Sequence, residues 1–249
     1  MNILVTSGST ITMIDKVRGI TNIFRGRTGF KIAEEAVYRG HSVTLIANPV
    51  TKEWAELMTA TPDGGYQTFE VLTYKTFDEL EMLMRKELWK QEYNVCIHSA
   101  AVSDYKVNGV FKNSATVLDF LNHTPLPALY EIANPPGKIG SKLDELWLRL
   151  THTTKLVDHI REWGLGDGKL VKFKLEVNVS PEELFNRASK SREESNADLI
   201  VANRLDDFSD WTTPSMQIIN RKNNVIEISR KEMPGKLLDM LEAKSITPA

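Results

Sequence analysis

A turn of small residues follows the first apolar run of the chain and suits the close approach of an anionic ligand. The run over residues 2–7 predicts a buried strand, and Gly8, Ser9 and Thr10 come directly after it. Glycine lets a backbone come close to a ligand, and amides and hydroxyls can donate to phosphate oxygens. A small-residue turn after a strand is as often only a turn, so both interpretations stand. The segment lacks both the P-loop and the dinucleotide-binding glycine patterns.

A long connection rich in arginine and glycine lies between this strand and the first predicted helix. Over residues 14–29 it holds Arg18, Asn22 and Arg25, interleaved with glycines. Guanidinium groups pair bidentately with phosphate or carboxylate, and glycine lets the backbone close in on the ligand. The sequence therefore predicts an anion-binding loop here, with a solvated basic loop as the alternative.

An acidic residue follows a second buried strand, predicted over residues 94–100. Ala100 and Ala101 leave room for a ring, and Asp104 offers an acceptor to a sugar hydroxyl or a base edge. A surface acid in a turn is the competing interpretation. In an open parallel sheet the loops after the strands meet at one edge, where ligands bind, so we expect Asp104 to lie near the small-residue turn.

The elements that must position these residues alternate strands with helices. Apolar periodicity and two capping boxes, Thr76 with Glu79 and Ser180 with Glu183, predict helices over 29–39, 76–91 and 155–163 and one opening at residue 180. Predicted strands cover residues 2–7, 42–46, 67–73, 94–100, 145–150, 169–177 and 198–202, and a hairpin pairs 216–219 with 225–228. A last helix ends near residue 243. Helical crossovers between strands predict an α/β fold with a mostly parallel sheet and a C-terminal β-hairpin extension.

We expect one domain spanning residues 1–249. Two stretches, 49–65 and 102–139, do not fit the alternation and are predicted to be long loops, which in compact domains usually serve binding. The loops over 8–28 and 102–140 are expected to surround the site. The exposed-looking hairpin 214–229 is a candidate dimerisation element.

Composition excludes several classes of protein. The net charge of −2 lacks the basic excess that nucleic-acid binding requires. The single cysteine, Cys96, permits no intramolecular disulfide, which fits a reducing, cytoplasmic setting, and we find no export signal and no apolar stretch that could span a membrane. The five histidines show no metal-ligand spacing, so no protein metal site is expected.

Ordered motifs along the chain resemble those of the phosphopantothenate–cysteine ligases, the phosphopantothenoylcysteine synthetases. The motifs are VTSGST, IDKVRGITN with a following RGRTG, AAVSDY, GKIGSK, VKFKLE, and NRASKS with DLIVAN. They extend from residue 3 to about residue 240. No one of them is highly specific, but their order and spacing are.

This resemblance implies a Rossmann-like three-layer sandwich and a ligase of coenzyme A biosynthesis. Such enzymes activate the carboxylate of 4'-phosphopantothenate with a nucleoside triphosphate, releasing pyrophosphate, and the amine of L-cysteine then displaces the nucleoside monophosphate. The resemblance favours CTP over ATP as cosubstrate, with Mg²⁺ carried on the phosphates, and implies a cytoplasmic homodimer. Because Met1 already begins the first strand, we expect no flavin decarboxylase domain in front and a separate decarboxylase.

The resemblance also implies roles for particular residues. Lys138 would neutralise the α-phosphate during activation, and the Asn22 amide would serve turnover of the acyl nucleotidylate. Nucleotide-binding residues implied together with the small-residue turn are Gly8, Ser9, Asp104, Lys138 and Phe173, and substrate-binding residues are Arg18, Asn22 and Arg25.

Three departures from the family pattern put parts of this assignment in question. Ser9 stands where a second glycine is usual, Ile-Phe-Arg-Gly-Arg follows Asn22 where Ser-Ser-Gly-Lys is common, and Lys142 stands in a shifted register after Lys138. The altered loop after Asn22 motivates a first alternative, a nucleotide-binding regulatory protein of the same fold without turnover. A nicotinamide-dependent reductase is a second alternative, and the missing dinucleotide fingerprint argues against it.

Overall fold

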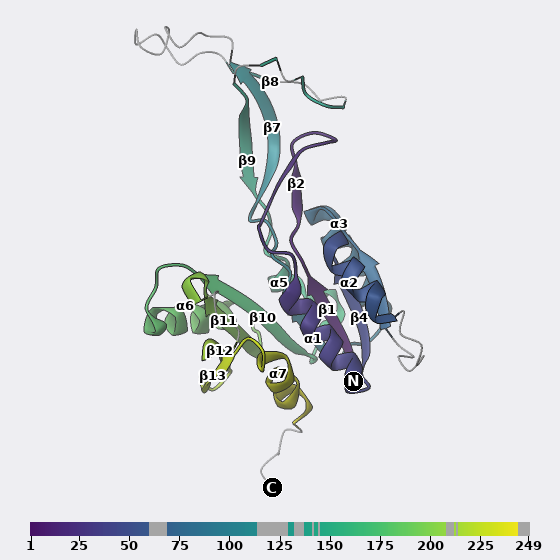
Figure 1. Ribbon diagram of the computed structural model, residues 1–249, viewed down its shortest axis with the longest axis vertical. Coiled ribbons are helices and arrows are strands. Elements are labelled where there is room, and N and C mark those ends of the chain that lie inside the picture. The colour runs from purple at the N-terminus through teal and green to yellow at the C-terminus, as the bar shows by residue number, and fades with distance from the viewer. Residues whose placement is uncertain are drawn as a thin grey trace.

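The structure is a computed structural model that describes residues 1–59, 69–113, 129–131, 137–140, 142–143, 145–207, 212 and 214–243. It contains one large sheet with helices on both faces and a narrow arm that projects from the carboxyl edge of that sheet (Figure 1). Among the described residues no helix is both long and apolar enough to cross a bilayer.

The large sheet has eight strands in the order β13-β12-β11-β10-β6-β1-β4-β5. Its strands are β1 (Asn2–Ser7), β4 (Ser42–Ala47), β5 (Phe69–Thr73), β6 (Val95–His98), β10 (Lys169–Glu176), β11 (Leu199–Arg204), β12 (Pro214–Asn220) and β13 (Val225–Ser229). Six strands run parallel, and β12 and β13 form an antiparallel hairpin at one edge. This confirms the predicted α/β fold with a mostly parallel sheet and a C-terminal hairpin.

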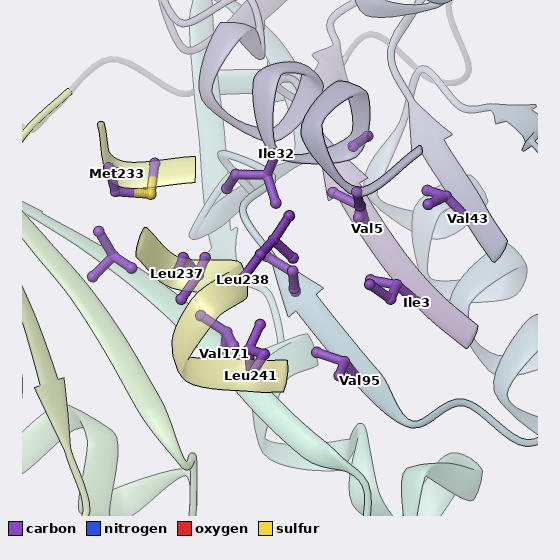
Figure 2. Packing of buried hydrophobic residues seen from close by; sticks show 14 of the residues in the cluster. Ile3, Val5, Ile32, Val43, Val95, Val171, Met233, Leu237, Leu238 and Leu241 are labelled. Atoms are coloured by element: carbon purple, nitrogen blue, oxygen red, sulfur yellow. The ribbon is translucent and has the colours of Figure 1, made fainter. Parts of the chain in front are cut away.

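Helices cover both faces of the large sheet, because consecutive residues of its central strands are apolar and point alternately to the two faces. One face carries α1 (Arg27–Tyr38), α2 (Pro49–Thr59) and α7 (Met233–Glu242), and the other carries α3 (Phe77–Lys90), α5 (Leu156–His159) and α6 (Pro181–Glu194). On the first face Leu237, Leu238 and Leu241 of α7 pack beside Ile32 of α1 and over Val171 of the sheet (Figure 2). The three-layer sandwich is therefore confirmed.

Two small sheets lie outside the large one and build the arm. The strands β2 (Ile11–Met13) and β3 (Gly19–Thr21) form a short hairpin, and β7 (Tyr105–Asn113) pairs with β8 (Leu129–Glu131) and β9 (Trp147–His152). The Thr12 hydroxyl donates to the Tyr105 carbonyl at 3.0 Å, which ties the hairpin to β7. The ribbon extends well beyond the large sheet (Figure 1).

Three of the expected long loops are wrong in part, because they contain regular elements. Helix α2 occupies Pro49–Thr59, because proline at the first helical position is compatible with a helix that continues after it. Within the stretch expected as a loop over 102–139 the chain forms β7 and β8, and within 8–28 it forms β2 and β3. Residues 60–65 of the first of these stretches, and 114–128 and 132–136 of the second, lie outside the described residues.

The hairpin 214–229 is part of the large sheet. Met216 and Ile218 of β12 are buried in the core beneath α7. Only the outer strand β13 lies at an edge, where Val225 is exposed.

Candidate functional site

A cavity of about 430 Å³ lies at the carboxyl edge of the large sheet. The residues that line it come from the turn after β1, the start of α1, the segment after β6, the ends of β10 and β11, and the hairpin side of the sheet. Loops after parallel strands meet at this edge, as the strand order requires.

The first turn of α1 forms one wall of the cavity. Gly26 precedes the helix with a φ of 94°, and among the described residues no side chain caps the helix there. Two hydroxyl groups fix the backbone just before α1. Ser7 Oγ donates to the Gly26 carbonyl at 2.6 Å, and Thr51 Oγ1 donates to the Arg25 carbonyl at 2.8 Å. Thr28 of this first turn lines the cavity. An uncapped helix amino terminus attracts anions through its amides and dipole.

The turn at Gly8 is fixed by a buried tyrosine. The Tyr74 hydroxyl lies 3.0 Å from the Ser7 carbonyl and 2.8 Å from the Gly8 carbonyl. Burial raises the pKa of Tyr74 far above its usual range, so the hydroxyl stays a donor. Gly8 has a φ of 94°, and a Cβ there would collide with the Asn48 side chain. Only glycine fits this turn, which keeps the backbone beside the cavity.

The segment after β6 forms a second wall, and Asn22 is attached to it. Asn22 Nδ2 donates to the Ala101 carbonyl at 3.1 Å, and the Ala101 amide donates to the Gly8 carbonyl at 2.9 Å. Asp104 lines the cavity from the same segment. Among the described residues the Asn22 side chain bonds only to this carbonyl, so a second N–H and the amide oxygen are available to a ligand.

A buried histidine supports this wall from inside the sheet. His98 Nδ1 lies 2.9 Å from Thr6 Oγ1, and the same hydroxyl accepts from the Ala100 amide at 3.2 Å. Burial first, and the charge of Lys172 second, lower the pKa of His98 to about 4. The imidazole is therefore neutral at physiological pH, and through Thr6 it helps to hold the backbone at Ala100 in place.

The opposite wall comes from strands at the hairpin side of the sheet. Phe173 of β10, Asn203 of β11, Met216 of β12 and Arg230 after β13 line it. Asn203 pairs directly with Met216 in the antiparallel ladder, which brings these distant segments together. Phe173 offers a half-buried ring, a surface on which a base or a sugar can pack.

The charges around the cavity favour an anion. Arg25, Arg27, Lys174 and Arg230 line it, and Asp104 is the one acidic residue in the described lining. Within the described part of the chain no three histidine, cysteine, aspartate or glutamate residues gather where they could hold a metal ion. The positive field would concentrate polyanionic ligands in the cavity.

The structure brings five of the predicted site residues to this cavity and leaves three outside its lining. Lining residues are Gly8, Asn22, Arg25, Asp104 and Phe173. Ser9 is buried below the turn, where its hydroxyl accepts from Thr21 at 3.0 Å. Arg18 and Lys138 are exposed and lie together near the tip of the β2–β3 hairpin.

Asp15 joins this hairpin tip to the segment that carries Lys138. Its Oδ2 accepts from Arg18 Nη2 at 2.6 Å and from the Ile139 amide at 3.0 Å, and Arg18 Nη2 also donates to the Ile139 carbonyl at 3.0 Å. The Arg18 guanidinium beside Asp15 holds the pKa of that carboxyl well below its usual range. The carboxylate therefore remains ionised and anchors the backbone next to Lys138.

Several lining residues are absent from the sequence-based prediction. Asn203 directly follows the predicted strand over 198–202, so the rule that ligands bind beyond strand ends could have found it. Arg230 lies after the hairpin, and only the antiparallel pairing of β12 and β13 returns it to this edge. Phe24 and Arg27 lie in the loop whose sequence departs from the family pattern, and both line the cavity.

Comparisons with known proteins identify relatives over nearly the whole chain. Residues 1–116 match the family model of the DNA/pantothenate metabolism flavoprotein C-terminal domain. The bifunctional coenzyme A biosynthesis protein CoaBC of Thermococcus kodakarensis is 33% identical over 242 residues, which cover 96% of this chain and 50% of that protein. CoaBC of Escherichia coli K12 is 29% identical over 252 residues, with the same coverage of both. The chain thus spans about half the length of the curated relatives it matches.

Solved structures agree with this relationship. The DNA/pantothenate metabolism flavoprotein from Streptococcus pneumoniae has a TM-score of 0.75 and 29% identity, covering 97% of this chain and 98% of that one. A Cab2 mutant in complex with phosphopantothenate-cysteine shares the fold, with a TM-score of 0.68, 17% identity, and coverage of 97% and 86%. The resemblance indicated by the ordered motifs is confirmed, because residues 1–116 match this family model and the CoaBC relatives align with nearly the whole chain.

Proposed function

We propose that this protein joins 4'-phosphopantothenate to L-cysteine through an acyl-nucleotidylate intermediate, as a ligase of coenzyme A biosynthesis. The observation that carries the proposal is the cavity lined by Asn22, Asp104 and the uncapped amino terminus of α1, found in a chain that matches this family model over residues 1–116. The names of its relatives, CoaBC and the Cab2 complex with phosphopantothenate-cysteine, supply the substrate class.

The first step brings two anions together, and the positive charges that line the cavity favour it. The substrate carboxylate attacks the α-phosphorus of the triphosphate, an oxygen–phosphorus bond forms, and pyrophosphate leaves. The positive field of Arg25 and Arg27 and the α1 dipole lower the repulsion between the reactants. Lys138 is proposed to add charge at the α-phosphate.

The second step is attack of the cysteine amine on the acyl carbonyl. A carbon–nitrogen bond forms, the amine loses a proton, and the nucleoside monophosphate leaves. Asn22 is held by its bond to the Ala101 carbonyl, so its remaining N–H is positioned to donate to the acyl-phosphate oxygen and its oxygen to accept from the amine. We assign Asn22 to this step.

We propose CTP rather than ATP as the preferred cosubstrate, on the basis of the family resemblance. Phe173 would pack against the nucleotide, and the Gly8 turn, with Ser9 beneath it, would lie beside the phosphates. Mg²⁺ prefers six oxygen ligands and keeps several waters. Since Asp104 is the one carboxylate of the described lining, the remaining ligands would come from the phosphates and water.

We further propose a homodimer formed through the arm. Apolar side chains are exposed along both parts of the arm, among them Met13, Val17, Ile20, Tyr105, Trp147 and Leu150. Exposed apolar side chains gathered on one projecting arm favour an interaction site, which a second copy would cover. Arg18 and Lys138 lie on this arm and outside the lining of their own cavity. In the proposed dimer they act at the partner's cavity.

Pyrophosphate release tests the function. The ligase requires release that depends on both phosphopantothenate and a triphosphate, before cysteine is added. Nucleotide binding without release would favour the regulatory protein of the same fold. Nucleotide-dependent hydride transfer would favour the reductase instead.

A further inference from the structure

Arg230 places a permanent positive charge on the cavity wall farthest along the sheet from α1. It follows β13 directly and is 8% exposed, yet it lines the cavity beside Met216 and Phe173. A guanidinium is charged at every physiological pH, and its field is stronger in a partly enclosed, apolar setting than at an open surface. Nothing in the sequence motifs marks this residue.

The positions of the other charges suggest which part of a ligand Arg230 meets. The uncapped start of α1, with Arg25 and Arg27, forms one positive wall, and Arg230 forms a second. Lys174 also lines the cavity, but its ammonium is paired with Glu176 at 2.9 Å. Asp104 lies on the wall after β6, and three strands separate β6 from β13, which Arg230 directly follows. Two positive walls on one cavity suit a ligand with several negative charges along its length, which a phosphate chain has and a base lacks.

We propose that Arg230 binds the phosphate chain of the nucleotide and so determines the preference for triphosphates over nucleosides. The inference rests on the proposed function, because it takes the cavity to be the nucleotide site. The fork of the guanidinium allows two parallel hydrogen bonds to phosphate oxygens, which lysine cannot reproduce. Arg230 would act on binding of the triphosphate and on the departure of pyrophosphate.

Calorimetric titration with CTP, CMP and cytidine tests this role, with ATP, AMP and adenosine in parallel. For Arg230→Met we expect about 10- to 100-fold weaker binding of the triphosphate, as loss of a charge-assisted hydrogen bond implies, and unchanged binding of the nucleoside. The triphosphate affinity of Arg230→Lys should lie between those of the wild type and Arg230→Met. The matched control is Arg192→Met, since Arg192 is 4% exposed on α6, on the other face of the sheet, and does not line the cavity.

Three results would overturn the inference: equal triphosphate affinity in wild type and Arg230→Met, equal loss for nucleoside and triphosphate, or the same loss in Arg192→Met. If Arg230→Met fails to fold, as circular dichroism would show, the ratio of triphosphate to nucleoside affinity in Arg230→Lys decides. Failure of the proposed function looks different. In that case the wild type binds neither triphosphate, or binds one but releases no pyrophosphate with phosphopantothenate.

Discussion

Asn22 combines exposure to the cavity with a fixed orientation. Its Nδ2 is bound to the Ala101 carbonyl, and the rest of the amide is left for a ligand. For Asn22→Ala we expect the acyl nucleotidylate to accumulate and turnover to fall about 100-fold, the usual cost of removing one positioned donor. Mass spectrometry of quenched reactions measures both. Asn2→Ala, at the amino edge of the sheet, is the control, and parental turnover in Asn22→Ala would contradict the assigned role.

His98 makes the stability of the fold depend on pH. Its pKa is near 6.5 in the unfolded chain and about 4 when folded, so between these values the unfolded state binds more protons. This contribution to stability is complete above about pH 6.5 and is lost at about 1.4 kcal/mol per pH unit as the pH falls toward 4. Urea unfolding at about pH 6.5 and about pH 5 should show a smaller difference in His98→Asn than in wild type. Equal differences would mean that His98 does not carry this linkage.

At the scale of elements, Asp15 couples the β2–β3 hairpin to the segment around Lys138. Its carboxylate accepts from the Arg18 side chain and from the Ile139 amide. In Asp15→Asn the charge is lost, so we expect hydrogen exchange of the Ile139 amide to rise about tenfold while α3 stays protected. The control is Asp206→Asn, whose carboxylate accepts from the Asn178 amide elsewhere on the surface. Unchanged exchange at Ile139 would show that Asp15 does not hold the segment.

The alternation of strands and helices was readable from the sequence because each element carries its own local signal. Thr76 and Ser180 both form the capping boxes expected from their spacing with glutamates three residues later. Helix α2 replaces part of the loop predicted over 49–65, which the sequence indicates only because that stretch does not fit the alternation, although Pro49 suits a first helical position. The arm was missed for another reason: Tyr105 pairs with His152, and no local pattern encodes a pairing so far apart in sequence.

The candidate site was predictable where it lies on strand ends and unpredictable where it depends on long-range pairing. Gly8 and Asp104 follow parallel strands, so the strand-end rule locates both. Arg230 reaches the cavity through the register of two antiparallel strands. Lys138 lies on the arm because Asp15 and Ile139 bond, which sequence spacing does not reveal.

For the whole molecule, the apolar arm predicts the assembly. Trp147 is 52% exposed on β9, and we expect Trp147→Glu to weaken dimerisation by about 30-fold or more, as burial of a charge at an interface centre implies. Light scattering after size-exclusion chromatography measures the mass. Trp89→Glu is the control, because Trp89 is 87% exposed on α3, outside the arm. A wild-type monomer, or equal effects of the two changes, would contradict an interface at the arm.

Mixing two inactive variants tests whether Lys138 acts across that interface. A dimer of Lys138→Ala with Asn22→Ala retains one complete site only if Lys138 serves the partner's cavity. After subunit exchange, half of the dimers are mixed and each has one of two sites intact, so activity should return to about a quarter of wild type. If differently tagged mixed dimers form and stay inactive, Lys138 does not act in the partner's site.

Product identification tests the central claim most directly. The purified protein is incubated with phosphopantothenate, cysteine and CTP or ATP in turn, and the products are weighed by mass spectrometry. We predict the amide of phosphopantothenate with cysteine, together with one nucleoside monophosphate and one pyrophosphate per amide, and more with CTP than with ATP. If no amide forms with either triphosphate while both substrates bind, the chain is not a ligase.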